Sequence, residues 1–348
     1  MASSKLFVHG CGGAGVTLAH MIQHSEIGLL TDEQVSISYM DTTARNTDIL
    51  KVNNDIQMNI TTLHSENNVS KSVDGGGGDR TRNYQAIRNQ AGDYLDKLGV
   101  KGFVQGEVHV IIYSSSRSSG SVIGPVLHNY LLQKGASVIS VVIGDSDALI
   151  HATNTRNTLI GLNEMGKKLD KPVMVRYFDN NPDDADDRTS ALEQVNVNVV
   201  KFVSRIQLFM CDGLYDMDST DIAVLLDPSI HSKIDGFVQS GIHNIDYYTG
   251  DSPAPDNILS LRSLSSGGIS HHDVDGVMDV KHGDITSASI IDIVGGILPV
   301  SLYVQTGTFA DILNRLEELV SCFNDRALAL VQDKLSPTDA PDDIGMVL

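Results

Sequence analysis

The stretch Gly10-Cys11-Gly12-Gly13-Ala14-Gly15 decides the fold of this 348-residue chain. It fits the pattern G-x-G-x-x-G and stands between Lys5–His9, an apolar run typical of a strand, and Val16–His24, which has helical spacing. Glycines let the backbone turn tightly and approach a phosphate, and the start of the following helix offers free N–H groups. We therefore expect a nucleotide-binding strand–loop–helix unit, with a plain tight turn as the alternative.

Strand and helix signals continue to alternate beyond this loop. Val35–Met40 alternates as a strand and stops at Asp41. Further strands are expected at Val108–Tyr113, Ser137–Ile143 and Pro172–Tyr177, and helices at Val122–Gln133, Ala152–Leu169 and Leu192–Met210. This order predicts an α/β fold with a parallel sheet and helices on both faces. The length favours two domains, and a boundary is expected near Asp216–Pro228.

Composition excludes several classes of protein. With 25 Lys+Arg against 44 Asp+Glu, the net charge of −19 repels phosphate backbones, so we expect no nucleic-acid binding. No apolar run reaches the roughly 20 residues of a membrane helix, so no membrane is expected. Met1–Lys5 runs directly into the first strand, and we expect no signal peptide. Three scattered cysteines give no disulfide framework, which favours a reducing cytoplasm.

Two further loops carry residues suited to phosphate. Asp74–Arg80 contains four consecutive glycines, which predict a flexible lid, a backbone wrap around a phosphate, or a solvated surface loop. Ser114–Ser121 combines hydroxyls with Gly120 and Arg117 at a strand–helix junction, as an oxyanion cradle requires. Three such loops at the carboxyl ends of strands indicate one phosphate-rich ligand, such as a nucleoside triphosphate.

Two carboxylates stand three residues apart at Asp218 and Asp221. At the start of a helix this spacing places both on one face, where they could polarise a water or hold a cation. Asp is also a common helix cap, which is the alternative. Asp41 at the end of a strand suits a ribose hydroxyl, so a dinucleotide-dependent dehydrogenase is the main rival. That rival leaves the four-glycine loop and the aspartate pair unexplained.

The order and spacing of these loops over residues 5–325 resemble the tubulin/FtsZ superfamily. Within it, Ser119–Pro125 and Asp343–Leu348 are most similar to tubulin-like proteins of large, nucleus-forming bacteriophages. The resemblance implies a Rossmann-type parallel-sheet GTPase domain at 1–190 and a long central helix with the start of a catalytic loop at 191–215. It also implies a smaller α+β activation and polymerisation domain at 216–325, then a helix end with an acidic tail at 326–348.

The resemblance further implies a GTPase that polymerises head to tail, with GTP or GDP and with Mg²⁺ held through the nucleotide phosphates rather than by assigned side chains. Asp218 and Asp221 would orient the attacking water on the next subunit's nucleotide. The implied nucleotide-binding residues are Gly12, Gly13, Ala14, Gly15, Thr17, Asp41, Thr42, Gly76, Gly77, Gly78, Arg117, Ser118, Ser119, Gly120, Ser121, Asn157 and Asn196. The implied tail contacts with a neighbouring subunit are Asp339, Asp342, Asp343, Met346 and Leu348; a solubilising tail is the alternative.

The partners implied are further copies of the chain, in filaments that position the phage nucleus, its DNA or capsids in the cytoplasm of an infected bacterium. One loop departs from the family pattern, because Ser116-Arg117-Ser118 replaces glycines. Either Arg117 supplies a charged contact, or the loop stands off and hydrolysis is slow. The second outcome would make the protein a nucleotide-binding filament scaffold. Thr17 stands where an Asn often contacts the base, which bears on guanine selectivity.

Overall fold

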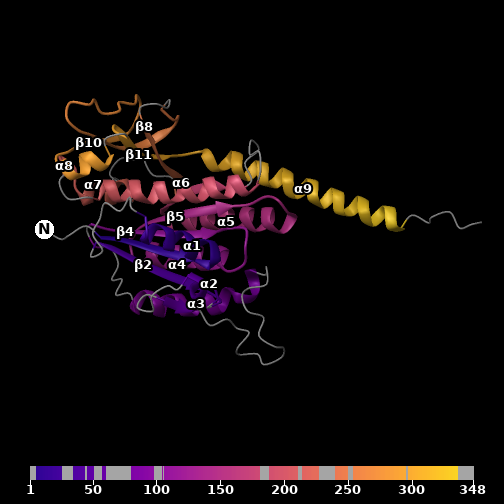
Figure 1. The fold of residues 1–348 in the computed structure, drawn as a ribbon. Helices are drawn as coiled ribbons and strands as arrows, with labels where there is room; N and C mark the ends of the chain where they lie inside the picture. The colour runs from indigo at the N-terminus through magenta and orange to yellow at the C-terminus, as the bar shows by residue number, and fades with distance from the viewer. Residues whose placement is uncertain are drawn as a thin grey trace, which may run out of the picture.

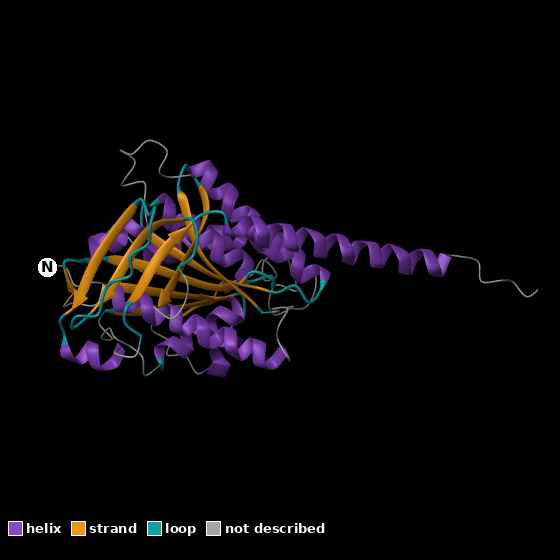
Figure 2. Cartoon of the chain, turned by 90° about the horizontal axis from the view of Figure 1, so that it is seen from above, coloured by secondary structure: helices purple, strands orange, loops and turns teal. Residues whose placement is uncertain are grey.

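A computed structural model describes residues 5–25, 34–43, 45–50, 57–59, 80–97, 104, 106–180, 188–210, 214–226, 240–249, 254–294 and 297–335. Within these ranges one 11-stranded sheet runs through the molecule in the order β3-β2-β1-β4-β5-β6-β8-β11-β9-β10-β7, with helices on both faces (Figures 1 and 2). The expected α/β class is confirmed.

The first six strands in that order are all parallel, and their order, 3-2-1-4-5-6, is that of a doubly wound sheet. The strands are β1 (Lys5–Cys11), β2 (Val35–Asp41), β3 (Gln57–Asn59), β4 (Glu107–Ser114), β5 (Ser137–Gly144) and β6 (Pro172–Asp179). The helices are α1 (Gly12–Gln23), α2 (Arg45–Leu50), α3 (Arg80–Lys97), α4 (Gly120–Gln133), α5 (Leu149–Leu169) and α6 (Arg188–Phe209). The chain reverses its winding between β1 and β4, and such sheets bind ligands at that point.

Two apolar cores cover the two faces of the sheet. Side chains of α1, α6 and α7 (Ser219–Leu226) share one core, and side chains of α3, α4, α5 and α9 (Thr308–Leu335) share the other. The strand β5 is buried along its whole length, because helices cover both of its faces. This accounts for the near-continuous apolar sequence of the central strands.

The sheet continues into the second half of the chain without a break. β6 pairs in parallel with β8 (Gly241–Thr249), and Pro172 lies opposite Gly241. Beyond it lie β11 (Val300–Gln305), β9 (Ile258–Ser265), β10 (Asp279–Ile285) and β7 (Leu214–Tyr215), with α8 (Ala288–Val294) close by in sequence. The boundary expected near Asp216–Pro228 begins directly after β7, the last strand in the order, and it stays a prediction.

The last helix, α9, projects beyond the body of the molecule (Figures 1 and 2). Its first half packs on the core through Phe309 and Leu316, and Arg156 of α5 forms an ion pair with Glu317. Farther along, Leu328 is 60% exposed. Among the described residues, no helix combines the length and apolar character that crossing a membrane would require.

Two expectations for the helices need correction. α1 begins at Gly12, inside the glycine loop, and not at Val16. The 18-residue helix α3 was not expected at all. Its sequence is strongly polar, and among the α3 side chains that the structure describes, Ile87 and Tyr94 are the buried apolar ones. Ile87 and Tyr94 stand seven residues apart, as on one face of a helix, but two apolar positions in a polar stretch are a weak signal.

Candidate nucleotide site and aspartate pair

A cavity of about 450 Å³ lies at the carboxyl ends of the parallel strands, where the winding reverses. This volume falls in the range of small-molecule sites, roughly 300–1,000 Å³. The lining residues come from the ends of β1, β2, β4, β5 and β6 and from the first turns of neighbouring helices: Cys11, Gly12, Gly13, Ala14, Asp41, Thr43, Asn46, Ser114, Ser116, Arg117, Ser118, Ser119, Gly120, Asp145, Asn180 and Leu192.

Two helices begin at this cavity. α1 starts at Gly12 and α4 starts at Gly120, and neither carries an acidic residue in its first turn. The first N–H groups of a helix have no partner within it, and the helix dipole places positive potential there. Two such ends, with Arg117 between the cavity and solvent, make the site suited to an anion such as a phosphate chain.

Glycines bring these loops together. Gly12 has a φ of +70°, and a Cβ there would lie 2.6 Å from the backbone nitrogen of Gly120. The first glycine loop therefore contacts the start of α4 through backbone alone. At Gly15, a Cβ would lie 2.1 Å from the carbonyl oxygen of Ile112. Gly15 consequently serves the close packing of α1 on β4 and does not line the cavity.

Hydrogen bonds from neighbouring elements hold the serine loop. Ser116 is only 2% exposed, and its hydroxyl shares a hydrogen bond of 2.9 Å with the hydroxyl of Ser114. The Asn154 side chain of α5 donates to the carbonyl oxygen of Ser116 at 3.0 Å. The hydroxyls of Thr42 and Ser119 share a hydrogen bond of 2.6 Å. The loop is thus tied to the end of β2 and to α5.

A half-buried arginine adds a further tie at the start of α3. Arg80 donates to the carbonyl oxygens of Asn154 at 2.9 Å and Ser121 at 3.1 Å. Burial lowers the pKa of this guanidinium. Arg80 therefore fixes the first residue of α3 against the start of α4 and against α5.

Asp41 lies at the cavity with both carboxylate oxygens engaged. Oδ1 accepts a hydrogen bond from the Thr42 backbone at 2.6 Å, and Oδ2 accepts one from the Asn46 side chain at 2.5 Å. Burial raises the pKa of Asp41, and these hydrogen bonds work in the opposite direction. Burial also raises the pKa of the Cys11 thiol, so Cys11 is a packed residue and not an activated nucleophile.

The structure brings eight of the expected nucleotide-binding residues to the cavity wall: Gly12, Gly13, Ala14, Asp41, Arg117, Ser118, Ser119 and Gly120. Six others do not line it: Gly15, Thr17, Thr42, Ser121, Asn157 and Asn196. Thr17 is exposed and donates to the carbonyl oxygen of Gly13, and Asn157 is exposed on α5. Asn196 lies on α6 one turn beyond Leu192, which does line the cavity. Gly76–Gly78 and the five tail residues lie outside the described residues.

Several lining residues were not expected from the sequence, among them Asn46, Asp145 and Asn180. Asp145 directly follows β5, and Asn180 directly follows β6. A polar residue at the carboxyl end of a parallel strand was the signal that could have identified both.

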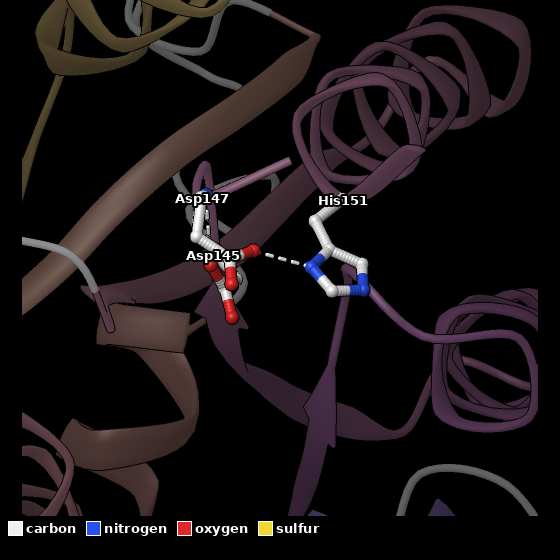
Figure 3. Close-up of side chains that lie close together, drawn as sticks. All are labelled: Asp145, Asp147 and His151. Carbon is white, nitrogen blue, oxygen red and sulfur yellow. Dashed lines mark hydrogen bonds and ion pairs between the residues drawn. The ribbon is translucent and has the colours of Figure 1, made fainter. Parts of the chain in front are cut away.

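Asp145 also belongs to a cluster with Asp147 and His151 (Figure 3). In the described part of the chain this is the one group of three metal-capable side chains whose ligand atoms lie within 4.8 Å of one another. Asp145 is 3% exposed, and its Oδ1 accepts from the Asp147 backbone at 3.1 Å. His151, one turn away on α5, pairs with Asp147. That ion pair accounts for two of the three side chains, and it leaves Asp145 as the member that faces the cavity.

The two expected catalytic aspartates form a reciprocal cap at the start of α7. Asp218 Oδ1 accepts from the backbone N–H groups of Thr220 at 2.7 Å and Asp221 at 3.3 Å. Asp221 Oδ2 accepts from the Asp218 backbone at 2.9 Å. This is the geometry of a capping box, so the capping alternative describes the local structure correctly. It uses one oxygen of each carboxylate and holds both side chains in defined positions.

The aspartate pair lies far from the cavity of its own chain. Leu192 near the start of α6 lines the cavity, and α6 then runs along the sheet to Phe209, about 25 Å away at 1.5 Å per residue. Figure 1 shows α7 beside the far end of α6. Within one chain the cavity and the aspartates therefore do not meet.

Comparison with known proteins gives relatives of one kind. No family model matches the chain. A phage tubulin-like protein of Pseudomonas phage phiKZ is 25% identical over 226 residues, which cover 64% of this chain and 62% of the relative. One of Pseudomonas phage 201phi2-1 is 24% identical over 167 residues, which cover 47% and 50%. The matched stretch thus spans less than two thirds of either relative.

Solved structures match over nearly the whole chain. A protofilament of TubZ from bacteriophage phiKZ has a TM-score of 0.76 at 22% identity, with 99% of this chain and 96% of that chain covered. The phage tubulin PhuZ with GDP has a TM-score of 0.71 at 17% identity, with 99% of each chain covered. The chain therefore has the tubulin/FtsZ-like fold, and it is similar in sequence and in structure to the tubulin-like proteins of bacteriophages.

Proposed function

We propose that the protein binds GTP in the cavity, assembles head to tail, and hydrolyses the nucleotide with Asp218 and Asp221 of the next subunit. One observation carries this proposal: an anion-suited cavity and a fixed carboxylate pair lie towards opposite ends of α6. A head-to-tail contact does not close, so it gives filaments. The similar structures include a TubZ protofilament and a PhuZ filament.

The residues of this chain divide the chemistry between them. The first N–H groups of α1 and α4 would bind phosphate oxygens, and Arg117 would add a positive charge. Asp218 and Asp221 would accept hydrogen bonds from a water and orient it for attack on the terminal phosphate. Because the capping bonds hold both carboxylates, the water would meet a preorganised pair.

The cavity also fits a divalent cation held mainly by phosphate oxygens. Asp41 and Asp145 are the carboxylates among the described lining residues, and Mg²⁺ prefers such oxygen ligands. Both oxygens of Asp41 accept hydrogen bonds, and Oδ1 of Asp145 accepts one from the Asp147 backbone, so the phosphates would supply most of the ligands. When bound, Mg²⁺ would neutralise charge that develops on the phosphates.

The biological setting follows from the relatives. Both sequence relatives described above come from Pseudomonas phages, so we place the filaments in the cytoplasm of an infected bacterium. Their task there would be to position the phage nucleus, its DNA or capsids. This assignment of location and cargo rests on that likeness alone.

A second candidate is a nucleotide-binding filament with little hydrolysis. It is favoured by the buried Ser116 side chain in a loop where related sequences carry glycines, because side chains there replace backbone contacts to phosphate. A dinucleotide-dependent enzyme shares the strand order of the first half but leaves the Asp218/Asp221 cap and the second half of the sheet without a role.

The test is phosphate release from GTP as a function of protein concentration, together with pelleting of polymer. For the wild type we expect turnover per molecule to rise with concentration, because each site is completed by a neighbour. Asp218→Ala should pellet with GTP and lose turnover about 100-fold or more, since it removes one water-orienting carboxylate. Asp93→Ala, an exposed change on α3, is the matched control and should behave as wild type.

Two outcomes would overturn the proposal in different ways. If the wild type pellets with GTP but releases no phosphate at any concentration, the protein is a nucleotide-binding filament without hydrolysis. Turnover per molecule that does not depend on concentration would place hydrolysis within a single chain.

A further inference from the structure

An arginine lies wholly inside the second half of the molecule, next to the aspartate pair. Arg262 on β9 is 1% exposed. Its Nη2 lies 2.8 Å from Asp279 Oδ2 on the neighbouring strand β10, and Nη1 donates to the Ser260 hydroxyl at 3.2 Å and to the Leu261 carbonyl oxygen at 2.9 Å. A buried guanidinium is costly unless it is paired and hydrogen-bonded, and this one is.

The Nε donor of this arginine reaches α7. Arg262 Nε donates to the backbone carbonyl oxygen of Asp221 at 2.9 Å. Asp221 in turn accepts from the backbone of Asp218, whose own carboxylate accepts from Asp221 and Thr220. An unbroken series of hydrogen bonds therefore runs from the sheet through Arg262 to both carboxylates.

We infer that Arg262 is a positioning residue that sets where α7 presents Asp218 and Asp221 to the neighbouring subunit. This inference rests on the proposed function. A pair that acts on another molecule's nucleotide gets no help from its own cavity, so its placement depends on how α7 is fixed to its own sheet. α7 is only eight residues long, and apolar packing through Ile222, Leu225 and Leu226 leaves its rotation and its position along its axis less tightly set than directed hydrogen bonds do.

The chemistry of the guanidinium explains why this position needs arginine. Its planar fork points Nε at α7 while Nη1 and Nη2 hold the strands. A lysine would keep the charge opposite Asp279 but lacks the separate donor that reaches Asp221. Misplacement of a reacting group by about 1 Å can cost about 100-fold in rate.

The test compares Arg262→Lys with Arg176→Lys. Arg176 on β6 is also paired with an aspartate on the adjacent strand, at 3.0 Å from Asp246, but it is not hydrogen-bonded to α7. Four quantities are measured for each full-length variant: thermal unfolding, GTP affinity at low protein concentration, polymer mass, and phosphate release per polymerised subunit. Asp218→Ala is measured beside them.

For Arg262→Lys we expect turnover per polymerised subunit to fall about 10- to 100-fold, while GTP affinity stays at the wild-type value. Arg262→Lys should melt below Arg176→Lys because its site is more buried, so turnover is compared well below both melting temperatures. In the background Asp218→Ala/Asp221→Ala, adding Arg262→Lys should slow turnover no further, because the arginine acts through the pair. If turnover falls equally in Arg176→Lys, Arg262 serves general stability and the inference is wrong.

The failure of the inference can be told from the failure of the proposed function. If Asp218→Ala retains turnover, the proposed function fails. If Asp218→Ala loses turnover while Arg262→Lys keeps it, the proposed function stands and the role of Arg262 is refuted. If Arg262→Lys does not fold, Asp279→Asn is the second variant, because it removes the negative charge that pairs with Nη2 of Arg262. A smaller fall in turnover is then expected.

Discussion

Arg117 brings a full positive charge to a cavity wall whose other charged side chains are the carboxylates Asp41 and Asp145. It is exposed, and among the residues that the structure describes it forms no hydrogen bond or ion pair. A guanidinium in this position is available to a ligand. Of the two outcomes that the sequence leaves open for the Ser116-Arg117-Ser118 loop, this geometry favours a charged contact over a loop that stands off.

Arg117→Ala should therefore weaken GTP binding. A hydrogen bond to a charged group contributes roughly 1.5–3 kcal/mol, which corresponds to about 10- to 100-fold in affinity. Arg88→Ala removes an exposed positive charge from α3 and serves as the control for the change in net charge. The measurement is titration with a labelled GTP analogue below the polymerisation threshold. Equal affinities for the two variants would assign Arg117 no part in nucleotide binding.

At the residue scale the sequence predicts the loops better than it predicts the individual contacts. Gly12 and Ser119 reach the cavity because each lies in a loop whose ends are fixed by a strand and a helix. Asn157 does not, because a residue on a helix points where the helix rotation directs it, and α5 turns Asn154 inward instead. Helix rotation depends on packing against elements far away in the chain, which a single sequence does not specify.

At the scale of elements, the contact between α1 and β4 is set by glycine. Gly15→Ala would place a Cβ 2.1 Å from the Ile112 carbonyl oxygen, so α1 must move away from the sheet. We expect a loss of stability of about 1–3 kcal/mol, the usual cost of overpacking, together with weaker GTP binding because the helix end shifts. Urea unfolding and nucleotide titration measure the two effects.

The matched variant is Gly161→Ala on α5. A Cβ there meets nothing within 4 Å, and the site is exposed in a helix interior. Alanine should stabilise the protein by about 0.5–1 kcal/mol, because glycine is the poorer helix former. If both variants move stability in the same direction, close packing at Gly15 is not the cause.

Most strands of the first half were predictable because clear apolar runs mark them, whereas the three-residue strand β3 was not expected. Expected and observed ends differ by at most two residues for β1, β2, β4, β5 and β6. The second half gave weaker signals, since its strands expose one face in part. β10, for example, buries only Gly283 and Ile285. The continuous pairing from β6 to β8 joins residues about seventy positions apart, and nothing local in the sequence indicates it.

At the scale of the whole molecule, buried histidines make stability sensitive to acid. His9, His109 and His128 are buried, and burial lowers the pKa of each, to about 3 for His109 and His128. The unfolded chain binds these protons below about pH 6.5, whereas the folded chain does not. Stability due to these groups is therefore present above pH 6.5 and is lost as pH falls towards 3.

His128→Gln isolates one of these groups. As pH falls from 6 to 4, the free energy of unfolding should drop less steeply for the variant than for the wild type. The difference is up to about 1.4 kcal/mol per pH unit, because the variant has no imidazole to protonate on unfolding. An amide can keep a hydrogen bond to Ser140, which now bonds His128 Nδ1 at 2.8 Å. Urea midpoints across this range give the two slopes. Parallel slopes would mean that His128 is already protonated in the folded state.

The placement of the cavity and α7 at opposite ends of α6 also has a consequence for counting. In the filament proposed above, a row of n subunits contains n − 1 completed sites, because the nucleotide of one terminal subunit has no neighbour's aspartates beside it. That subunit keeps its triphosphate however long the row becomes. The two ends then differ chemically as well as in shape: one end holds an unspent nucleotide, and the other presents a carboxylate pair with no nucleotide to act on. Subunits would accordingly be added and lost at different rates at the two ends.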